Sequence, residues 1–373
     1  MQASPVINEW IREGMQKILP DAHFTTLAIS DGGDGLLECL VHPQGGEIVE
    51  VTVSDPLLRK TQAQFGIVQK AGQKIAVIEM ARASGLNKLK PHERNIMKTT
   101  TYGTGELIGA AIDRECTRVI LGLGGGATSD GGLGACAALG LKILDKNQKG
   151  MNDREGMSFG AEVLSEIEGL EDSALRRKIQ GVEIIVLADV RIPLFGPQGV
   201  SYLFGPQKGA TPAQVELMEK GLKHYRDLLQ KFSGSPVESP YLGAAGGIGG
   251  SFMALCHSPL YHGIDYLLDE IHFDDLIADA DMVVTGEGSL DPLTLFGKAP
   301  LGIAQRCKKQ GIPVAGIFGR ILGDEKNYRD FFDYQINASR GQIVDVHDEK
   351  QRMEIIPSLI RSAASELARV LIS

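Results

Sequence analysis

The segment RVILGLGGGATSDGGLGACAALG, residues 118–140, decides the fold class. It begins with apolar, β-branched residues that are typical of a buried strand. The residues after Asp130 are small and apolar, which suits a closely packed helix. Glycine in the connecting loop lets backbone N–H groups approach a ligand, and a helix N-terminus adds positive potential. The segment therefore predicts an anion site between a strand and a helix.

Three interpretations of this loop remain open from its residues alone. Gly122, Gly124 and Ala127 fit the dinucleotide fingerprint, and Asp145 follows where a ribose-binding acid would stand. A nicotinamide-dependent dehydrogenase is one reading. A loop for nucleotide phosphates is the second, although the loop has no GK[ST] of the Walker type. A tight turn that needs glycine only for packing is the third.

The composition of the whole chain excludes several classes of protein. The 373 residues carry a net charge of −9, with 43% hydrophobic and 23% charged residues, as in globular proteins. No basic stripe indicates nucleic-acid binding. No apolar run reaches membrane-spanning length. The five cysteines lack C-x-x-C spacing, so we expect reduced thiols and a cytoplasmic protein.

Strand-like and helix-like segments alternate along most of the chain, which predicts an α/β fold with mainly parallel sheets. Expected strands are 25–30, 47–53, 63–68, 74–80, 118–124, 183–189, 281–287, 312–318 and 333–338. Expected helices include 103–116, 130–139, 212–232, 297–310 and 350–371. We expect one Rossmann- or flavodoxin-like domain made of residues 1–75 and 281–373. A second α/β domain, residues 76–280, would be inserted into it.

Aspartates stand at the expected strand ends, where ligands bind in open α/β sheets. The sequence SDGG occurs twice and places Asp31 and Asp130 before short apolar helices. Each Asp could hold Mg²⁺ or a polyol, or could cap its helix. Asp189 follows the strand at 183–189 and could be a general base, a metal ligand or a residue that only starts a loop.

Three further segments carry candidate groups. Lys208 lies in the Gly- and Pro-framed loop FGPQKGA, where a lysine suits a phosphate. The segment GAAGGIGGSF, residues 243–252, could contact a nucleotide or only pack closely. TGEGSLDPLTLFGKAPLG, residues 285–302, brings Glu287, Asp291 and Lys298 into one loop. The chain has neither a Ser–His–Asp nor a Cys–His pattern. Its glycine loops, acids and lysines favour phosphoryl transfer, which needs positioning, Mg²⁺ and cationic or N–H donors.

Together these segments resemble the first type of bacterial glycerate kinase. The similarity covers nearly the whole chain, in the order SDGGDG (30–35), IEMARASGL (78–86), TTYGTGELI (100–108), LGGGATSDGGLG (123–134), ADVRIPLFGPQG (188–199), LFGPQKGAT (203–211), GAAGGIGG (243–250) and VTGEGSLDPLTLFGKAPLG (284–302). The resemblance implies a two-domain enzyme that phosphorylates D-glycerate with ATP and Mg²⁺, generally to 2-phosphoglycerate. A homo-oligomer is compatible with it, as is an inactive relative that binds sugar acids.

The resemblance also assigns expected roles to residues of this chain. The expected catalytic residues are Asp189, Lys208, Asp130 and Lys298, with Asp189 and Asp130 also expected to bind the metal. The expected nucleotide-binding residues are Gly124, Gly125, Gly126, Thr128, Gly246, Gly247 and Gly249. The expected substrate-binding residues are Asp31, Ser129, Glu287 and Asp291.

The chain departs from the family pattern at four places. The family begins with a strand and a loop like APDSFK, whereas this sequence starts at the first helix, and we expect a mis-called start codon. Ser129 and Ile192 stand where Asn is usual, and Leu293 stands where Gln is usual. These three changes remove polar groups, so a changed substrate or a weaker activity is also expected.

Overall fold

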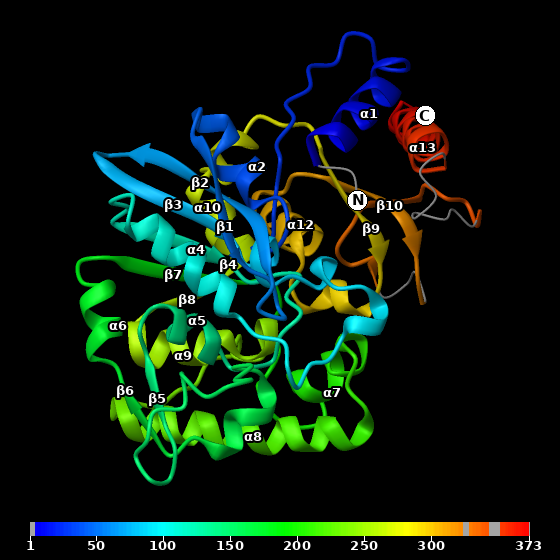
Figure 1. Cartoon of the computed structure of the whole chain (residues 1–373). Coiled ribbons are helices and arrows are strands. Elements are labelled where there is room, and N and C mark those ends of the chain that lie inside the picture. Colours follow the sequence, from blue (N-terminus) through cyan, green and yellow to red (C-terminus); the bar gives the residue numbers. More distant parts are fainter. Residues whose placement is uncertain (1–3, 324–327, 343–350, 373) are drawn as a thin grey trace. The chain divides into compact units, whose positions relative to one another are not determined.

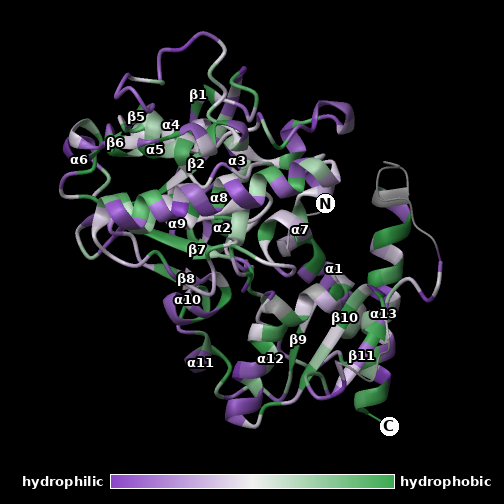
Figure 2. Cartoon of the chain, turned by 90° about the horizontal axis from the view of Figure 1, so that it is seen from below, coloured by the Kyte–Doolittle hydropathy of each residue, from purple (hydrophilic) through white to green (hydrophobic). Residues whose placement is uncertain are grey.

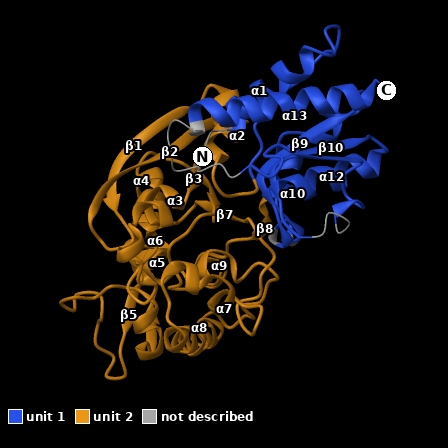
Figure 3. Ribbon diagram, turned by 90° about the vertical axis from the view of Figure 1, so that its right-hand side faces the viewer, with its two compact units in different colours: residues 1–30, 264–373 blue, residues 31–263 orange. Residues whose placement is uncertain are grey.

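The fold is that of a computed structural model, which describes residues 4–323, 328–342 and 351–372 (Figure 1). The chain separates into two compact units, drawn in different colours in Figure 3. Unit 1 comprises Met1–Ser30 and Ile264–Ser373, and unit 2 comprises Asp31–Gly263. Both units mix helices with strands, and most strand pairs of the two units taken together are parallel, so the α/β class predicted from the sequence is confirmed.

The expected boundaries at 75/76 and 280/281 differ from those of the compact units. The cut at residue 75 would separate β2 (Lys60–Lys70) from most of β3 (Gln73–Glu79), yet these strands are hydrogen-bonded neighbours. Residues 31–75 therefore belong to unit 2 with the sheet that they complete. The second boundary moves from 281 to Ile264, so that the helix beginning at Gly263 falls almost entirely within unit 1.

Unit 2 is built on a six-stranded sheet in the order β1-β2-β3-β4-β7-β8. The remaining strands of this sheet are β1 (Glu47–Ser54), β4 (Arg118–Gly122), β7 (Glu183–Ala188) and β8 (Leu260–His262). Strands β1, β2 and β3 pair antiparallel, each with the next along the chain. Strands β3, β4, β7 and β8 are parallel, so their carboxyl ends share one edge of the sheet. A separate antiparallel pair joins β5 (Lys142–Leu144) to β6 (Gly169–Glu171).

Helices connect and cover the strands of unit 2. They are α2 (Leu36–Leu40), α3 (Ala81–Ser84), α4 (Tyr102–Ile112), α5 (Leu133–Ala138), α6 (Ser173–Lys178), α7 (Val200–Phe204), α8 (Pro212–Ser233) and α9 (Ile248–Cys256). The helix α8 begins in a capping box in which Thr211 accepts a hydrogen bond from the backbone N–H of Gln214. Hydrophilic and hydrophobic residues both run along α8 (Figure 2), and its buried residues recur at helical spacing. One apolar face therefore holds α8 on the core.

Unit 1 contains a parallel three-stranded sheet in the order β11-β10-β9. The strands are β9 (Val283–Leu290), β10 (Val314–Ile321) and β11 (Tyr334–Asn337), and the helices are α1 (Ser4–Gln16), α10 (Gly263–Glu270), α11 (Phe273–Leu276), α12 (Ala299–Gln310) and α13 (Ile356–Leu371). The first and last helices of the chain, α1 and α13, pack side by side, and Ser365 Oγ donates to the carbonyl of Gly14 at 2.7 Å. This packing buries Met15 of α1 in one apolar cluster with Ala364 and Leu367 of α13.

Two expected elements differ from the structure. Residues 25–30 do not form a strand, although TTLAIS has strand composition. The expected helix 350–371 is regular only from Ile356, because Gln351–Ile355 form a wider π-helical turn. Among the described residues, none of the helices has the length and apolar character needed to cross a membrane.

Candidate active site

Polar residues follow three neighbouring parallel strands of unit 2 at their carboxyl ends. Strand β3 ends at Glu79, β4 leads into the glycine loop 123–130, and β7 is followed by Asp189. Carboxyl ends of parallel strands are the usual place for ligands in open α/β sheets. This edge of unit 2 is the first candidate site.

Lys208 connects the β4 loop to the strand end of β7. It belongs to a 3₁₀ turn, Pro206–Lys208, and only 4% of its surface is exposed. Its Nζ donates to the backbone carbonyl of Thr128 at 2.7 Å. Burial lowers the pKa of Lys208 to about 8, while the negative charges of Asp189 and Asp130 oppose that shift. Lys208 therefore lies close enough to both aspartates for their charges to act on it.

Asp189 is half-buried beside the glycine loop. Its Oδ2 lies 3.5 Å from the position that a Cβ on Gly124 would occupy. Glycine at 124 therefore leaves room for this carboxylate, and a larger residue would press against it. Asp189, Lys208 and the loop 124–128 form one cluster of charge and accessible backbone.

Asp130 has a different environment from the one expected of a base or a metal ligand. It is fully buried, and its carboxylate accepts hydrogen bonds from five groups. The donors are the backbone N–H groups of Thr101, Gly132 and Gly134 and the hydroxyls of Thr100 and Thr101, at 2.7–3.3 Å. Burial raises the pKa of Asp130, and these hydrogen bonds oppose the shift. The geometry favours the capping interpretation over metal binding, because the lone pairs are already used inside the protein.

The loop after β4 exposes only part of its glycine run. Gly125 is exposed with a φ of 73°, Gly126 is half-buried, and Gly124 is buried against Gly33. The next two side chains, Thr128 and Ser129, are fully buried, and their hydroxyls have no hydrogen-bond partner among the described residues. Buried polar groups normally have a partner. Gly125, Gly126 and these two hydroxyls are thus the parts of the loop best suited to a ligand.

The second glycine segment, residues 243–249, packs against the first. A Cβ on Gly246 would lie 2.1 Å from the carbonyl oxygen of Thr128, and one on Gly249 would lie 2.5 Å from Leu260. Gly247 closes the segment with a φ of 87° and is buried against Leu194. The structure thus favours close packing over nucleotide contact for Gly246, Gly247 and Gly249. The backbone at Gly246 packs directly against Thr128 and Ser129 of the β4 loop.

Two of the residues that depart from the family pattern, Ser129 and Ile192, lie around this second segment. Ser129 contacts it at Gly246, whose Cβ position is 2.5 Å from the Cα of Ser129. Ile192 is fully buried, and its carbonyl accepts a hydrogen bond from the N–H of Gly243 at 2.8 Å. The side chain of Leu293 lies outside those that the structure describes.

The loop after β9 gathers the residues expected from TGEGSLDPLTLFGK within unit 1. Thr294 donates its hydroxyl to Glu287 at 2.5 Å. Lys298 Nζ lies 3.4 Å from Glu287 and 3.8 Å from Asp291. Partial burial raises the pKa of Glu287, whereas the hydrogen bond from Thr294 and the charge of Lys298 lower it. The structure thus brings these two acids and the lysine together.

The dehydrogenase interpretation of the β4 loop is wrong. Asp145 follows β5, which pairs antiparallel with β6 outside the large sheet, whereas a ribose-binding acid follows a parallel neighbour of the glycine-loop strand. Its carboxylate also holds its own turn, because it accepts from the N–H groups of Asn147 and Lys149 at 2.8 and 3.0 Å. Arg154 pairs with its second oxygen.

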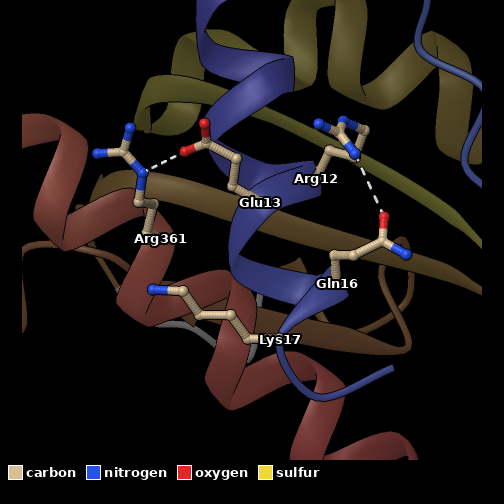
Figure 4. Close-up of a pocket in the computed structure, with 5 residues that line it drawn as sticks. All are labelled: Arg12, Glu13, Gln16, Lys17 and Arg361. Atoms are coloured by element: carbon tan, nitrogen blue, oxygen red, sulfur yellow. Dashed lines mark hydrogen bonds and ion pairs between the residues drawn. The ribbon is translucent and has the colours of Figure 1, made fainter. Parts of the chain in front are cut away.

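A pocket of unit 1 is lined by none of the expected site residues. It is lined within unit 1 by Arg12, Glu13, Gln16, Lys17 and Arg361 (Figure 4). Arg361 pairs with Glu13, and Arg12 donates to Gln16 at 3.2 Å. These contacts lie on α1 and between α1 and α13, so we assign them to helix packing.

Sequence reasoning missed Arg82 and its partner Glu79. Glu79 is the last residue of β3 and is 3% exposed, and Arg82 Nε donates to it at 2.5 Å. A glutamate that ends a run of buried apolar residues in KIAVIE is an uncommon position for a charge. That position, followed three residues later by an arginine, was the available signal.

Known proteins match the chain along its whole length. A family model described as the glycerate kinase family matches residues 1–372. A glycerate kinase of Haemophilus influenzae is 38% identical over 362 residues, which cover 97% of this chain and 93% of that protein. A glycerate 2-kinase of Escherichia coli K12 is 37% identical over 315 residues, which cover 84% of this chain and 81% of that protein.

A solved structure agrees with the sequence comparison. The crystal structure described as glycerate kinase 2 from Salmonella typhimurium LT2 has a TM-score of 0.80 and 34% identity, and the match covers 99% of this chain and 94% of that one. The protein therefore belongs to the glycerate kinase family of phosphotransferases.

Proposed function

We propose that this protein transfers the γ-phosphoryl group of ATP to a hydroxyl of D-glycerate and forms 2-phosphoglycerate. The observation that carries the proposal is the cluster of Lys208, Asp189 and the exposed Gly125 at one edge of the sheet. Phosphoryl transfer depends on positioning and on charge stabilisation. A buried lysine, a carboxylate and accessible backbone N–H groups provide both.

The residues of the β4 loop fit nucleotide phosphates. The backbone at Gly125 and Gly126 is accessible, and the buried Thr128 hydroxyl has no partner among the described residues. Fewer residues of this cluster suit Mg²⁺ than suit the nucleotide phosphates. Among the described residues, no group of three or more His, Cys, Asp or Glu side chains could hold a metal ion. Mg²⁺ is often held by one or two carboxylates and by substrate phosphates, and Asp189 is the carboxylate that suits it here.

The proposed mechanism assigns one task to each side chain of this cluster. Bound Mg²⁺–ATP supplies the phosphoryl group and neutralises part of its charge. Asp189 orients the substrate hydroxyl and accepts its proton, and it would help the nucleotide phosphates to hold Mg²⁺ when the ion is bound. Lys208 keeps two N–H groups beyond its bond to Thr128 and places them toward the transferred oxygens. Asp130 holds the loop in shape by its five hydrogen bonds.

The acidic loop of unit 1 is assigned to substrate binding. Lys298 carries the positive charge of that loop, and Glu287 and Asp291 restrict its position. We propose that Lys298 binds an anionic group of a substrate and that Glu287 and Asp291 contact hydroxyl groups.

The proposal is tested by incubating the purified chain with ATP and Mg²⁺, with and without D-glycerate. The amount of ADP formed is measured in both reactions. We expect ADP release that depends on D-glycerate. Isothermal titration of D-glycerate into the same protein separates an inactive binder from an enzyme. Binding without ADP release would favour a relative that has lost the chemistry.

A further inference from the structure

The pair formed by Glu79 and Arg82 lies beside the cluster that the mechanism uses, at the end of the next strand. Glu79 is 3% exposed and accepts three hydrogen bonds. Two come from the backbone N–H groups of Gly35 and Leu37 at 3.0 and 3.2 Å, at the start of α2. The third comes from Arg82 Nε at 2.5 Å. The carboxylate is therefore satisfied and fixed on three sides.

Arg82 turns part of its guanidinium away from this carboxylate. One third of the side chain, 33%, is exposed, and Arg82 Nη2 lies 3.8 Å from Glu38. A guanidinium has five N–H donors in a rigid planar fork, and the bond at Nε uses one of them. Because Glu79 holds Nε, the direction of the outer edge is set. An arginine held in this way can bind a planar oxyanion without ordering a flexible side chain.

The surroundings of Arg82 place it next to the accessible part of the glycine loop. The Cβ of the preceding residue, Ala81, lies 3.2 Å from the Cβ position of Gly125. The Asp34 carboxylate lies 3.7 Å from the same position. Helix α3, which carries Arg82, therefore borders the exposed Gly125 from the side of β3, and Asp189 borders Gly124 from the side of β7.

Three acids surround Arg82, and one of them is compensated in charge. The charge of Glu79 is balanced by the arginine and by the two N–H groups of α2. Loss of surrounding water and the charge of Glu79 raise the pKa of Asp34, and the charge of Arg82 opposes that shift. Glu38 is the remaining nearby carboxylate and lies at 3.8 Å.

Resting on the function proposed above, we propose that Arg82 binds an oxyanion of one of the two substrates at the rim of Gly125. The oxyanion is either the carboxylate of the three-carbon acid or a phosphate of the nucleotide. Arg82 makes the contact, and Glu79 is a positioning residue that acts through Arg82. Both residues are additional to those assigned from the motifs.

The test compares Arg82→Gln with a matched control, Arg118→Gln. Arg118 is also 33% exposed and donates from Nε to a glutamate, Glu183, at 2.6 Å, but it begins β4 at the opposite end of the strand. Isothermal titration measures the Kd of D-glycerate alone and of ATP alone for each variant. We expect a loss of at least tenfold in the affinity of one ligand for Arg82→Gln and a change of less than twofold for Arg118→Gln.

Each outcome decides between the two sources of the oxyanion or overturns the proposal. Weaker D-glycerate binding alone identifies the carboxylate, and weaker ATP binding alone identifies a phosphate. Unchanged affinity for both ligands would overturn the proposal, as would equal losses for both, which indicate a general structural effect. Turnover by the unmodified protein tests the proposed function separately, because these affinities are measured without turnover.

Two further variants separate positioning from folding. Glu79→Gln keeps an acceptor for the N–H groups of α2 but loses the ion pair, so it should weaken the same ligand as Arg82→Gln and spare the other. The double variant Glu79→Gln/Arg82→Gln leaves no unpaired buried charge. We expect it to unfold at the temperature of the unmodified protein and still bind that ligand at least tenfold more weakly. Restored affinity in the double variant would contradict the role of Arg82.

Discussion

The two SDGG segments of unit 2 have the same four residues but place their aspartates in different surroundings. In both, the Asp side chain accepts a hydrogen bond from the N–H group two residues later, at 3.2 Å for Asp31 and 3.1 Å for Asp130. Asp31 is half-buried, whereas Asp130 is fully buried and accepts four further bonds. The shared turn is therefore a local property, and the role of the carboxylate depends on what packs around it.

The largest expected effect is on stability and comes from Asp130→Ala. The variant leaves buried hydroxyl and N–H donors of Thr101, Gly132 and Gly134 without their acceptor. We expect the free energy of unfolding to fall by about 3 kcal/mol or more. Urea unfolding followed by circular dichroism measures it. If the variant kept its stability but lost its activity, Asp130 would act in the chemistry and not as the hydrogen-bond acceptor that holds the loop.

The second effect is on turnover and comes from Asp189→Asn and Lys208→Met. If these groups stabilise the transition state, each variant should lose at least about a hundredfold in kcat, or about 2.7 kcal/mol. Both substitutions keep the approximate shape of the side chain. Lys142→Met is a control at an exposed ion pair with Glu171. Normal kcat in both site variants would remove them from the mechanism.

The third effect is a pH dependence set by Lys208. Its pKa is lowered to about 8, so the charged form dominates below pH 8 and is lost as the pH rises through that value. If the charged form binds the phosphoryl oxygens, kcat/KM should be level below pH 8 and fall about tenfold per pH unit above it. Lys208→Arg should move this fall beyond pH 10, because a guanidinium stays charged. An identical fall in Lys208→Arg would assign it to another group.

The smallest effect is expected for Asp31→Ala, the counterpart of the first variant. A half-buried Asp that closes one turn should contribute about 1 kcal/mol to the free energy of unfolding. The same urea experiment measures it beside Asp130→Ala. Equal losses in the two variants would contradict the difference described above, and a loss confined to D-glycerate affinity would support the substrate role expected for Asp31.

Local patterns predicted most of the fold. Buried strands such as β4 and β7 are continuous apolar runs, and α8 carries a capping box and a regular apolar face. The boundary expected at residue 75 differs from that of the compact units, because the pairing of β2 with β3 is a contact between strands that the spacing of residues does not encode. TTLAIS has the composition of a strand but forms none. Strand propensity alone is therefore insufficient, because a strand also needs a neighbouring strand with which to pair.

The candidate site was predictable in its membership more than in its roles. Glycine, Asp and Lys at strand ends indicated Asp189, Lys208 and the loop after Glu287, and their part in the chemistry stays a prediction. Whether a glycine packs or faces a ligand depends on distant neighbours, as with Gly249 against Leu260. Whether an Asp is free for chemistry likewise depends on partners such as Thr101, which lies 29 residues away in sequence. The Glu79–Arg82 pair was missed because its proposed role depends on its position beside Gly125, which is distant in the sequence.

The most direct test of the central claim follows the phosphorus atoms themselves. The purified chain is incubated with D-glycerate, Mg²⁺ and ATP, and the mixture is examined by ³¹P NMR. We expect a new phosphomonoester signal that is coupled to the single proton of C2. This coupling identifies 2-phosphoglycerate. A signal coupled to the two protons of C3 would contradict the proposed product, and the absence of any phosphomonoester would contradict the proposed function.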